Sequence, residues 1–180
     1  MSSKYKSVQL TEVLQFLEGE ENNTKPFLFI NPTTTLETFF TYKANMKELN
    51  KMKLLLEMHP EKKSEIESEL RGCLESGMKI GSWVVFSLGS SPTFNLTSFL
   101  KQFPFYHKDM FQPVSIHNKD FCLQHNILRE ESNVDFYGNH GYFEIKETFK
   151  FCFLSTCKET EIDKLISSNP ELEFDVIIAQ

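Results

Sequence analysis

The chain has 180 residues, of which 40% are hydrophobic and 24% are charged. These proportions are typical of one folded domain and exclude collagen-like and disordered chains. Lysine and arginine together number 19, aspartate and glutamate 25, so the net charge is −6. Only Arg71 and Arg129 are arginines, and this acidic balance argues against nucleic-acid partners, which bind basic surfaces.

The cysteines and the apolar runs bear on the compartment. Cys73, Cys122, Cys152 and Cys157 form no C-x-x-C pair, which is typical of free thiols in a reduced cytoplasmic protein. The N-terminal residues lack the apolar segment of a secretory signal. Apolar runs are far shorter than the ~20 residues that span a bilayer. We therefore expect a soluble cytoplasmic protein without membrane contact.

The first elements in chain order are a helix, a loop and a strand. Apolar residues at helical spacing predict a helix over 7–18, and the polar stretch 19–25 predicts a loop. We assign residues 1–25 to an N-terminal helix and linker. Four successive apolar residues at 27–30 lie between prolines and predict a strand buried on both faces. This strand begins a single α/β domain that we expect over 26–180.

Two long helices and a second buried strand are predicted next. Apolar residues recur every three or four positions over 36–58, which predicts one amphipathic helix that stops near Pro60. A second helix is expected over 61–76, followed by a strand at 83–88. A short helix with Asn95 as its N-cap comes after the strand.

Residues 103–147 differ from the rest of the chain because they are rich in phenylalanine, histidine and asparagine. We expect an irregular aromatic-rich insert here, with a short helix near 119–130 and a β-turn at 138–141. Beyond the insert, the pattern predicts strands at 149–155 and 174–178 with a helix between them. Buried strands that alternate with helices predict an α/β fold, a mostly parallel sheet of about four strands flanked by helices.

One segment resembles a phosphate-binding loop. Gly72 to Lys79 matches G-x-x-x-x-G-K-[ST] with one residue inserted. Such a loop follows a strand and begins a helix, whereas this segment lies within and after a predicted helix that Gly77 is expected to end. We interpret it as a helix C-terminus.

Histidine and cysteine residues offer two further candidate sites. His117, Cys122 and His125 are metal-ligand types, but no second ligand pair accompanies them. Cys152 or Cys157 is a possible nucleophile beside a histidine, yet Cys152 lies in an apolar strand, the usual place of a structural thiol. We therefore predict no catalytic residue, no metal site and no cofactor.

Four pieces of the chain carry a family resemblance: PFLFINPTTTLETFFTYK (26–43), LRGCLESGMKIGSWVVFSLG (70–89), IKETFKFCFLSTCKE (145–159) and LEFDVIIAQ (172–180). In this order they resemble a nucleotide-fold module of the AAA+ superfamily, in particular a late module of the dynein heavy-chain ring. The resemblance implies a P-loop-like core. It also implies a ciliary or flagellar setting, in which the protein is built onto axonemal microtubules.

The chain departs from that family at the positions that hydrolysis needs. ATP hydrolysis requires a phosphate loop, strand-end acids that hold Mg²⁺, and a sensor. Here the strand at 83–88 runs into Gly89-Ser90-Ser91 without an acid, and Ser155-Thr156 stand at the sensor position. The resemblance thus implies a core without its phosphate loop, and we expect no ATP hydrolysis.

These observations lead us to expect a non-catalytic interaction module with protein partners in a larger intracellular assembly, and not an enzyme. Two alternatives stay open. One is a degenerate domain that binds a nucleotide or small ligand in the crevice near Asn31, Gly89 and Ser155. The other is an enzyme that uses cysteine or histidine chemistry.

The insert is the part of the chain most suited to partner binding. It holds nine aromatic residues, and aromatic side chains left on a surface commonly mark interfaces. We expect Phe105, Tyr106 and Phe111 to include partner-facing residues. The competing interpretation is that the insert folds over the sheet and buries them all.

Overall fold

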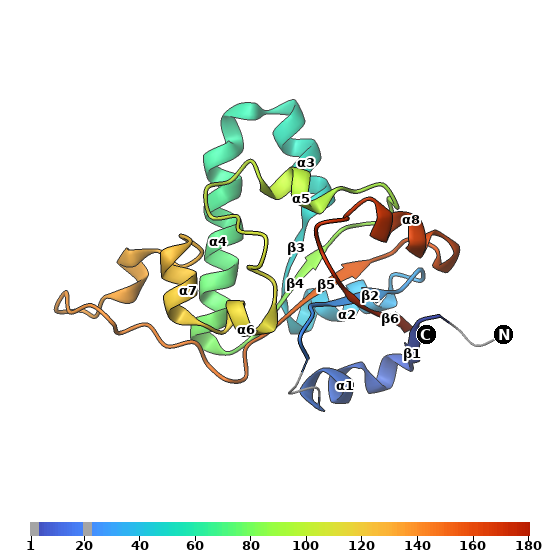
Figure 1. The fold of residues 1–180 in the computed structure, drawn as a ribbon, viewed down its shortest axis with the longest axis horizontal. Coiled ribbons are helices and arrows are strands. Elements are labelled where there is room, and N and C mark those ends of the chain that lie inside the picture. Colours follow the sequence, from blue (N-terminus) through green and yellow to red (C-terminus); the bar gives the residue numbers. More distant parts are fainter. Residues whose placement is uncertain (1–3, 20–22) are drawn as a thin grey trace.

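The structure, a computed structural model, describes residues 4–19 and 23–180, so the loop predicted over 19–25 lies partly outside it. Within the described residues, six parallel strands form one sheet in the order β1-β6-β2-β5-β4-β3, with helices on both faces (Figure 1). The predicted α/β architecture with a parallel sheet is confirmed. The number of strands is not, because two edge strands join the four expected ones.

Each predicted strand is present, with bounds that differ by at most one residue at either end. The strands are β1 (Lys6–Val8), β2 (Phe27–Ile30), β3 (Asn45–Glu48), β4 (Trp83–Ser87), β5 (Lys150–Ser155) and β6 (Asp175–Ala179). The unexpected strands are the short edge strands β1 and β3, which lack a continuous apolar run. Because β1 pairs with β6, the segment before residue 26 contributes a strand to the same sheet as the rest of the chain.

The single helix predicted over 36–58 is wrong. The segment forms α2 (Thr35–Lys43), then β3, then α3 (Leu49–Met58). Ala44 ends α2 in an extended conformation, and β3 pairs with β4 in the register Asn45↔Val84. Pairing with a neighbouring strand supplies the backbone hydrogen bonds here, and this tertiary context overrides the local helical pattern.

The remaining helices are short except for one. They are α1 (Val13–Gly19), α4 (Lys63–Ile80), α5 (Leu96–Leu100), α6 (Pro113–Ile116), α7 (Lys119–Gln124) and α8 (Ile162–Ser167). Single 3-10 turns occupy Leu10–Glu12, Pro60–Lys62, Glu130–Asn133 and Glu159–Glu161. Asn95 caps α5 as predicted, since its Oδ1 accepts a hydrogen bond from Ser98 N–H at 2.7 Å.

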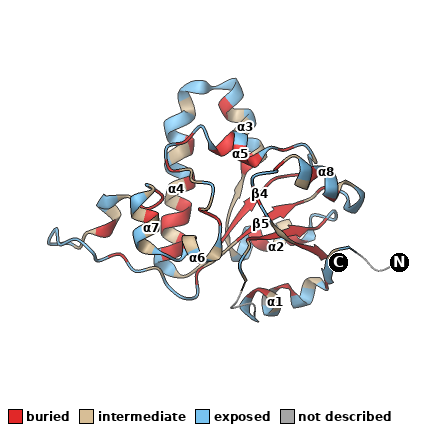
Figure 2. Cartoon of the chain, viewed as in Figure 1, coloured by how far each residue is buried: buried red, intermediate tan, exposed pale blue. Residues whose placement is uncertain are grey.

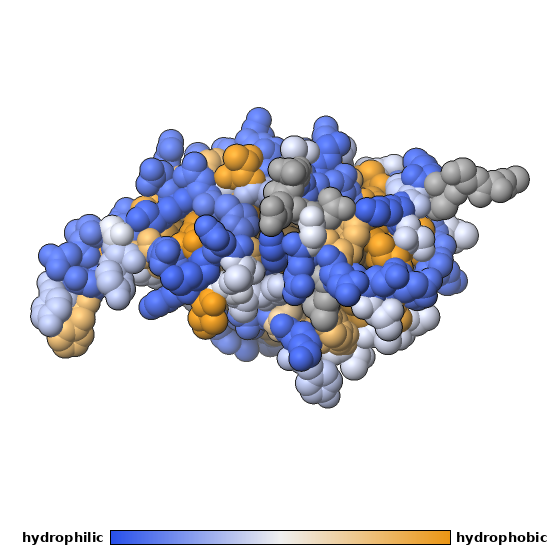
Figure 3. Space-filling view, turned by 90° about the horizontal axis from the view of Figure 1, so that it is seen from below, coloured by the Kyte–Doolittle hydropathy of each residue, from blue (hydrophilic) through white to orange (hydrophobic). Residues whose placement is uncertain are grey.

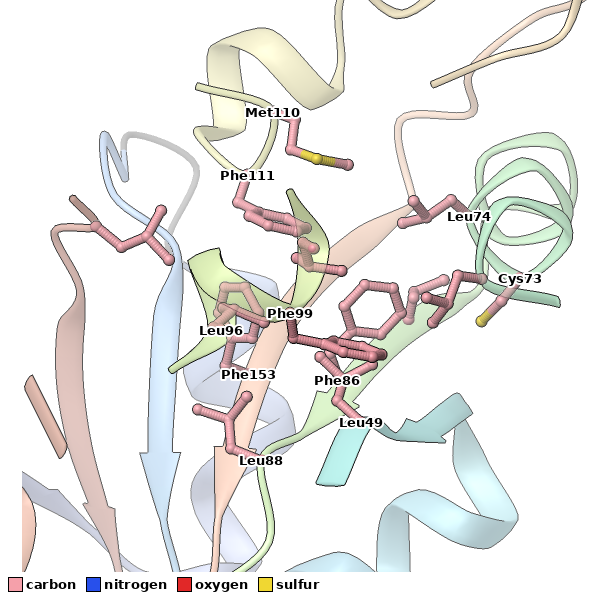
Figure 4. Packing of buried hydrophobic residues seen from close by; sticks show 14 of the residues in the cluster. Leu49, Cys73, Leu74, Phe86, Leu88, Leu96, Phe99, Met110, Phe111 and Phe153 are labelled. Atoms are coloured by element: carbon pink, nitrogen blue, oxygen red, sulfur yellow. The ribbon is translucent and has the colours of Figure 1, made fainter. Parts of the chain in front are cut away.

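Two hydrophobic layers enclose the sheet (Figure 2). On one face α1 and α2 pack on the strands through residues such as Leu17, Phe29 and Phe40. On the other face α3, α4, α5, α8 and the insert form a larger core, whose centre includes Phe86 and Phe153 (Figure 4). Successive strand residues point to opposite faces, so the central strands, which are covered on both sides, are largely apolar.

Helix α4 packs tightly against the sheet at Gly77. The predicted end of this helix is too early, because α4 continues through Gly77 to Ile80 and ends at Gly81. A Cβ atom at position 77 would collide with Val84 of β4 and crowd the Phe149 ring. Gly77 is therefore a packing position and not a helix end.

The free edge of β3 is short and charged. Lys47 pairs with Glu69 at 2.6 Å, and Lys51 pairs with Glu48 at 2.6 Å. Charged side chains and short length are the usual means by which a sheet edge avoids pairing with another chain. The edge therefore gives no reason to expect an added strand.

Candidate functional site

Parallel α/β sheets bind ligands at the carboxyl ends of their strands, where neighbouring connections leave toward opposite faces. That point lies between β2 and β5, because α2 packs on one face and α8 on the other. The three residues expected at this crevice, Asn31, Gly89 and Ser155, do come together. All three are buried.

The polar groups of the crevice bond to one another. Asn31 N–H donates to Ser155 O at 3.0 Å, and Ser155 Oγ–H donates to Gly89 O at 2.9 Å. The Asn31 side chain accepts from Leu36 N–H at 2.9 Å and donates to Ala179 O at 3.0 Å. Asn31 therefore caps α2 and ties β2 to β6, so it has a structural role.

A carboxylate also lies at this end of the sheet. Glu37, in the first turn of α2, accepts a hydrogen bond at Oε1 from Ser87 Oγ at 3.1 Å. Ser87 is the last residue of β4, a position at which ATP hydrolysis would require a Mg²⁺-binding acid. The acid here comes from the helix instead, and its charge opposes the approach of a phosphate group.

The four cysteines are all buried. Burial raises the pKa of the Cys73 thiol to about 11 and that of Cys122 to about 12. The pKa values of Cys152 and Cys157 are also raised, chiefly by burial. Since the thiolate is the nucleophile, these protonated thiols are poorly suited to covalent catalysis at neutral pH.

The structure does not bring His117, Cys122 and His125, the triplet considered as metal ligands in the sequence analysis, together as ligands. The His117 ring lies 5.2 Å from the Phe149 ring, and its pKa is lowered by desolvation and by the charge of Lys150. The His125 ring lies against the His107 ring, with centroids 4.0 Å apart and the ring planes tilted by 34°. In the described part of the chain, no group of three or more His, Cys, Asp or Glu side chains is placed to hold a metal ion.

Two of the three residues expected to face a partner lie in the core. Phe105 is 0% exposed and Phe111 is 1% exposed, while Tyr106 is half-buried. The Phe111 ring packs 4.9 Å from Phe153 above the sheet (Figure 4). For Phe105 and Phe111 the competing interpretation fits, because this part of the insert fills the space beside α4 and completes the core.

The exposed aromatic residues of the insert lie further along the chain. We name residues 133–142 the aromatic loop. Within it Phe136 is 96% exposed, Tyr137 85% and Tyr142 69%. The loop forms the end of the molecule farthest from the sheet in Figure 1, and the same end projects from the body in Figure 3.

Hydrogen bonds from two side chains order the aromatic loop. The Asp135 carboxylate accepts from the N–H groups of Tyr137 and Asn139 and from Asn139 Nδ2, each at 2.8 Å. These bonds lower the pKa of Asp135 because they favour its charged form. At the base, buried Asn133 accepts from Gly141 N–H at its carbonyl and from Phe143 N–H at Oδ1.

The sequence predicted a β-turn at 138–141 but not partner contact for the aromatic residues beside it. In the structure the turn bond joins Gly138 N–H to Asp135 O at 3.1 Å, three residues earlier in the chain. Asp135, Gly138, Asn139 and Gly141 are turn formers, and Gly138 and Gly141 have φ values of 82° and 90°. Aromatic side chains between closely spaced turn residues are poorly placed to reach a core. The spacing of turn residues around Phe136 and Tyr137 was therefore the sequence feature that could have indicated exposed aromatic side chains.

A hollow of about 610 Å³ lies at the amino ends of β2 and β5, lined by Phe27, Phe111 and Phe151 together with Lys25 and Lys150. Its volume is within the range of small-ligand pockets, about 300–1,000 Å³. Sites in parallel sheets lie at the carboxyl ends, so the fold gives no reason to place a ligand site here.

No helix in the described parts of the chain, 4–19 and 23–180, is long and apolar enough to cross a bilayer. Comparisons of the chain with protein-family models, with curated proteins and with solved structures find no match. Function must therefore be inferred from the residues of this chain.

Proposed function

We propose that the chain is a non-catalytic interaction module that binds protein partners within a larger assembly. The observation that supports this most directly is the aromatic loop, which holds three strongly exposed aromatic side chains on an ordered backbone. Exposed apolar groups of this kind mark interaction sites, and aromatic residues are enriched among those that dominate binding energy.

The crevice supports the same proposal, because its groups are already satisfied. A ligand that entered between β2 and β5 would displace the bonds of Asn31 and Ser155. Each buried group left unpaired costs about 1–3 kcal/mol. A nucleotide would in addition bring its phosphates toward Glu37. We therefore place nucleotide binding second.

A ciliary or axonemal assembly is the setting suggested by the resemblance to a dynein ring module. A parallel α/β sheet is compatible with that resemblance, but the same fold class serves many functions. The setting is tested by localising the tagged protein in ciliated cells. Signal confined to the axoneme would support it, and signal excluded from cilia would contradict it.

Isothermal titration separates the two functional alternatives. We expect neither Mg·ATP nor Mg·ADP to give a saturable heat at millimolar concentration. The Glu37→Gln variant is the matched control, since it removes the charge that opposes phosphate while leaving the Asn31 bonds in place. A dissociation constant of 1 μM, about −8 kcal/mol, for the unmodified chain would overturn the proposal.

A further inference from the structure

We propose that the aromatic loop inserts into an apolar pocket with a basic rim on a protein partner. This inference rests on the proposed function and adds the binding element and the chemistry of the partner. Phe136 and Tyr137 form the tip, with ring centroids 5.6 Å apart. Tyr142 lies at the C-terminal end of the loop.

The size of the loop fits the centre of an ordinary interface. An aromatic side chain buries about 150–250 Å². At the exposures observed, the three side chains offer on the order of 400–600 Å² to a partner. A typical interface takes about 800 Å² from each side, so the loop would supply its apolar core and the flanking residues its rim.

The backbone of the loop is organised before binding. The Asp135 carboxylate holds the tip, and Asn133 holds the base. The segment before the loop is fixed to α4, because Arg129 donates to the Glu75 carboxylate from Nε, at 3.1 Å to each oxygen, and from its backbone N–H at 2.8 Å. A loop ordered in this way loses little conformational entropy on binding, which favours affinity.

The charge around the loop identifies the rim of the partner. Acidic residues outnumber lysines on the loop and beside it: Glu130, Glu131, Asp135 and Glu144 against Lys119 and Lys146. Lys146 is paired with Glu144 at 2.5 Å, and Lys119 donates to Gly141 O at 3.1 Å. The net negative rim is complementary to lysine and arginine side chains.

The same charges argue against a membrane as the binding surface. Lipid surfaces inside cells are negatively charged and attract basic segments. Segments that lie in the membrane interface combine apolar side chains with lysine and arginine. The aromatic loop combines them with carboxylates instead, so a protein pocket is the better fit.

Site-specific photocrosslinking tests the position of the interface. The photoreactive residue p-benzoylphenylalanine replaces Phe136 in the full chain, and in control chains it replaces Leu54 or Val114. Both control side chains are also exposed, on α3 and α6. We expect the chain modified at 136 to crosslink to an apolar peptide flanked by lysine or arginine in one partner, and the control chains to give little of this product.

Affinity measurements on the purified pair then test the chemistry. The variant F136S/Y137S/Y142S should bind at least 100-fold more weakly, whereas the control L54S/M58S should change affinity less than 2-fold. The variant E130K/E131K should bind about 10-fold more weakly and lose most of its salt dependence. Because all of these side chains are exposed, the thermal unfolding midpoints should stay within a few degrees of that of the unmodified chain.

Different failures have different meanings. A partner that crosslinks from position 54 or 114 and binds F136S/Y137S/Y142S with unchanged affinity would overturn this inference and leave the proposed function standing. Loop-dependent sedimentation with vesicles of phosphatidylcholine and phosphatidylserine, without a protein crosslink, would assign the loop to a membrane and overturn it too. Absence of any protein crosslink from all three positions would count against the proposed function itself.

Discussion

The ion pair between Arg129 and Glu75 joins the insert to α4, and its removal should have a measurable effect on stability. Glu75 is on the buried side of α4, with 8% of its side chain exposed, while 37% of the Arg129 side chain is exposed. Replacing Arg129 with alanine strands a buried carboxylate. We expect Arg129→Ala to destabilise the fold and to loosen the insert.

The expected loss is about 2–3 kcal/mol. Removing one partner from a buried ion pair costs about 3–5 kcal/mol. Two features reduce that figure here. The backbone N–H of residue 129 keeps its hydrogen bond to Glu75 Oε1, and water can reach the pair along the exposed arginine. In a chain of this size, the loss corresponds to a fall of roughly 5–10 °C in the unfolding midpoint.

Urea and thermal denaturation measure this effect, with Lys101→Ala as the control. Lys101 pairs with Glu171 at 2.6 Å on the surface, where an ion pair contributes about 0–1 kcal/mol. Hydrogen exchange should increase more in 126–147 than in the sheet. The double variant Glu75→Leu/Arg129→Ala should recover at least half of the loss. A loss no larger than that of Lys101→Ala would refute the reasoning.

Three further predictions follow from buried positions. Gly77→Ala should destabilise the fold by about 2 kcal/mol or more, because the added methyl group overpacks against Val84. Gly72→Ala in the same helix has open space around it and should stabilise the fold by about 0.5–1 kcal/mol. Denaturant titration of both variants measures the two changes in unfolding free energy. Asn31→Ala should cost about 2–4 kcal/mol in the same titration, since it leaves Leu36 N–H and Ala179 O without their partner. The four buried thiols should react with Ellman's reagent at pH 7 only as fast as the chain opens, because they are buried and their pKa values are raised. Immediate reaction of one thiol would show an accessible thiolate and contradict the structure.

The central strands were predictable because a strand that is buried on both faces has a continuous run of apolar residues in the local sequence. Each of β2, β4, β5 and β6 contains four successive apolar residues, and this pattern can be read without knowing the neighbouring strands. The edge strands contain no such run. Asn45–Glu48 reads N-M-K-E and is half-buried throughout, so its identity as a strand depends on β4 beside it, which the local sequence does not show.

Burial of the insert was harder to predict for a related reason. The composition showed that the insert is rich in aromatic residues, but it does not show which of these rings are buried in the core. Phe105 and Phe111 are buried beside α4 and above β5, so partner contact was expected of the wrong rings. Whether a ring is buried depends on the path of the backbone, and only the turn residues around Phe136 gave a local clue.

The most direct test of the central claim is the mass and composition of the native assembly. The tagged full-length protein is purified gently from its own cells, separated by size, and analysed by light scattering and quantitative mass spectrometry. The account predicts a species well above the 21.0 kDa of this chain, with at least one other protein in a fixed ratio. Elution at the mass of the free chain with no partner in fixed ratio would contradict it.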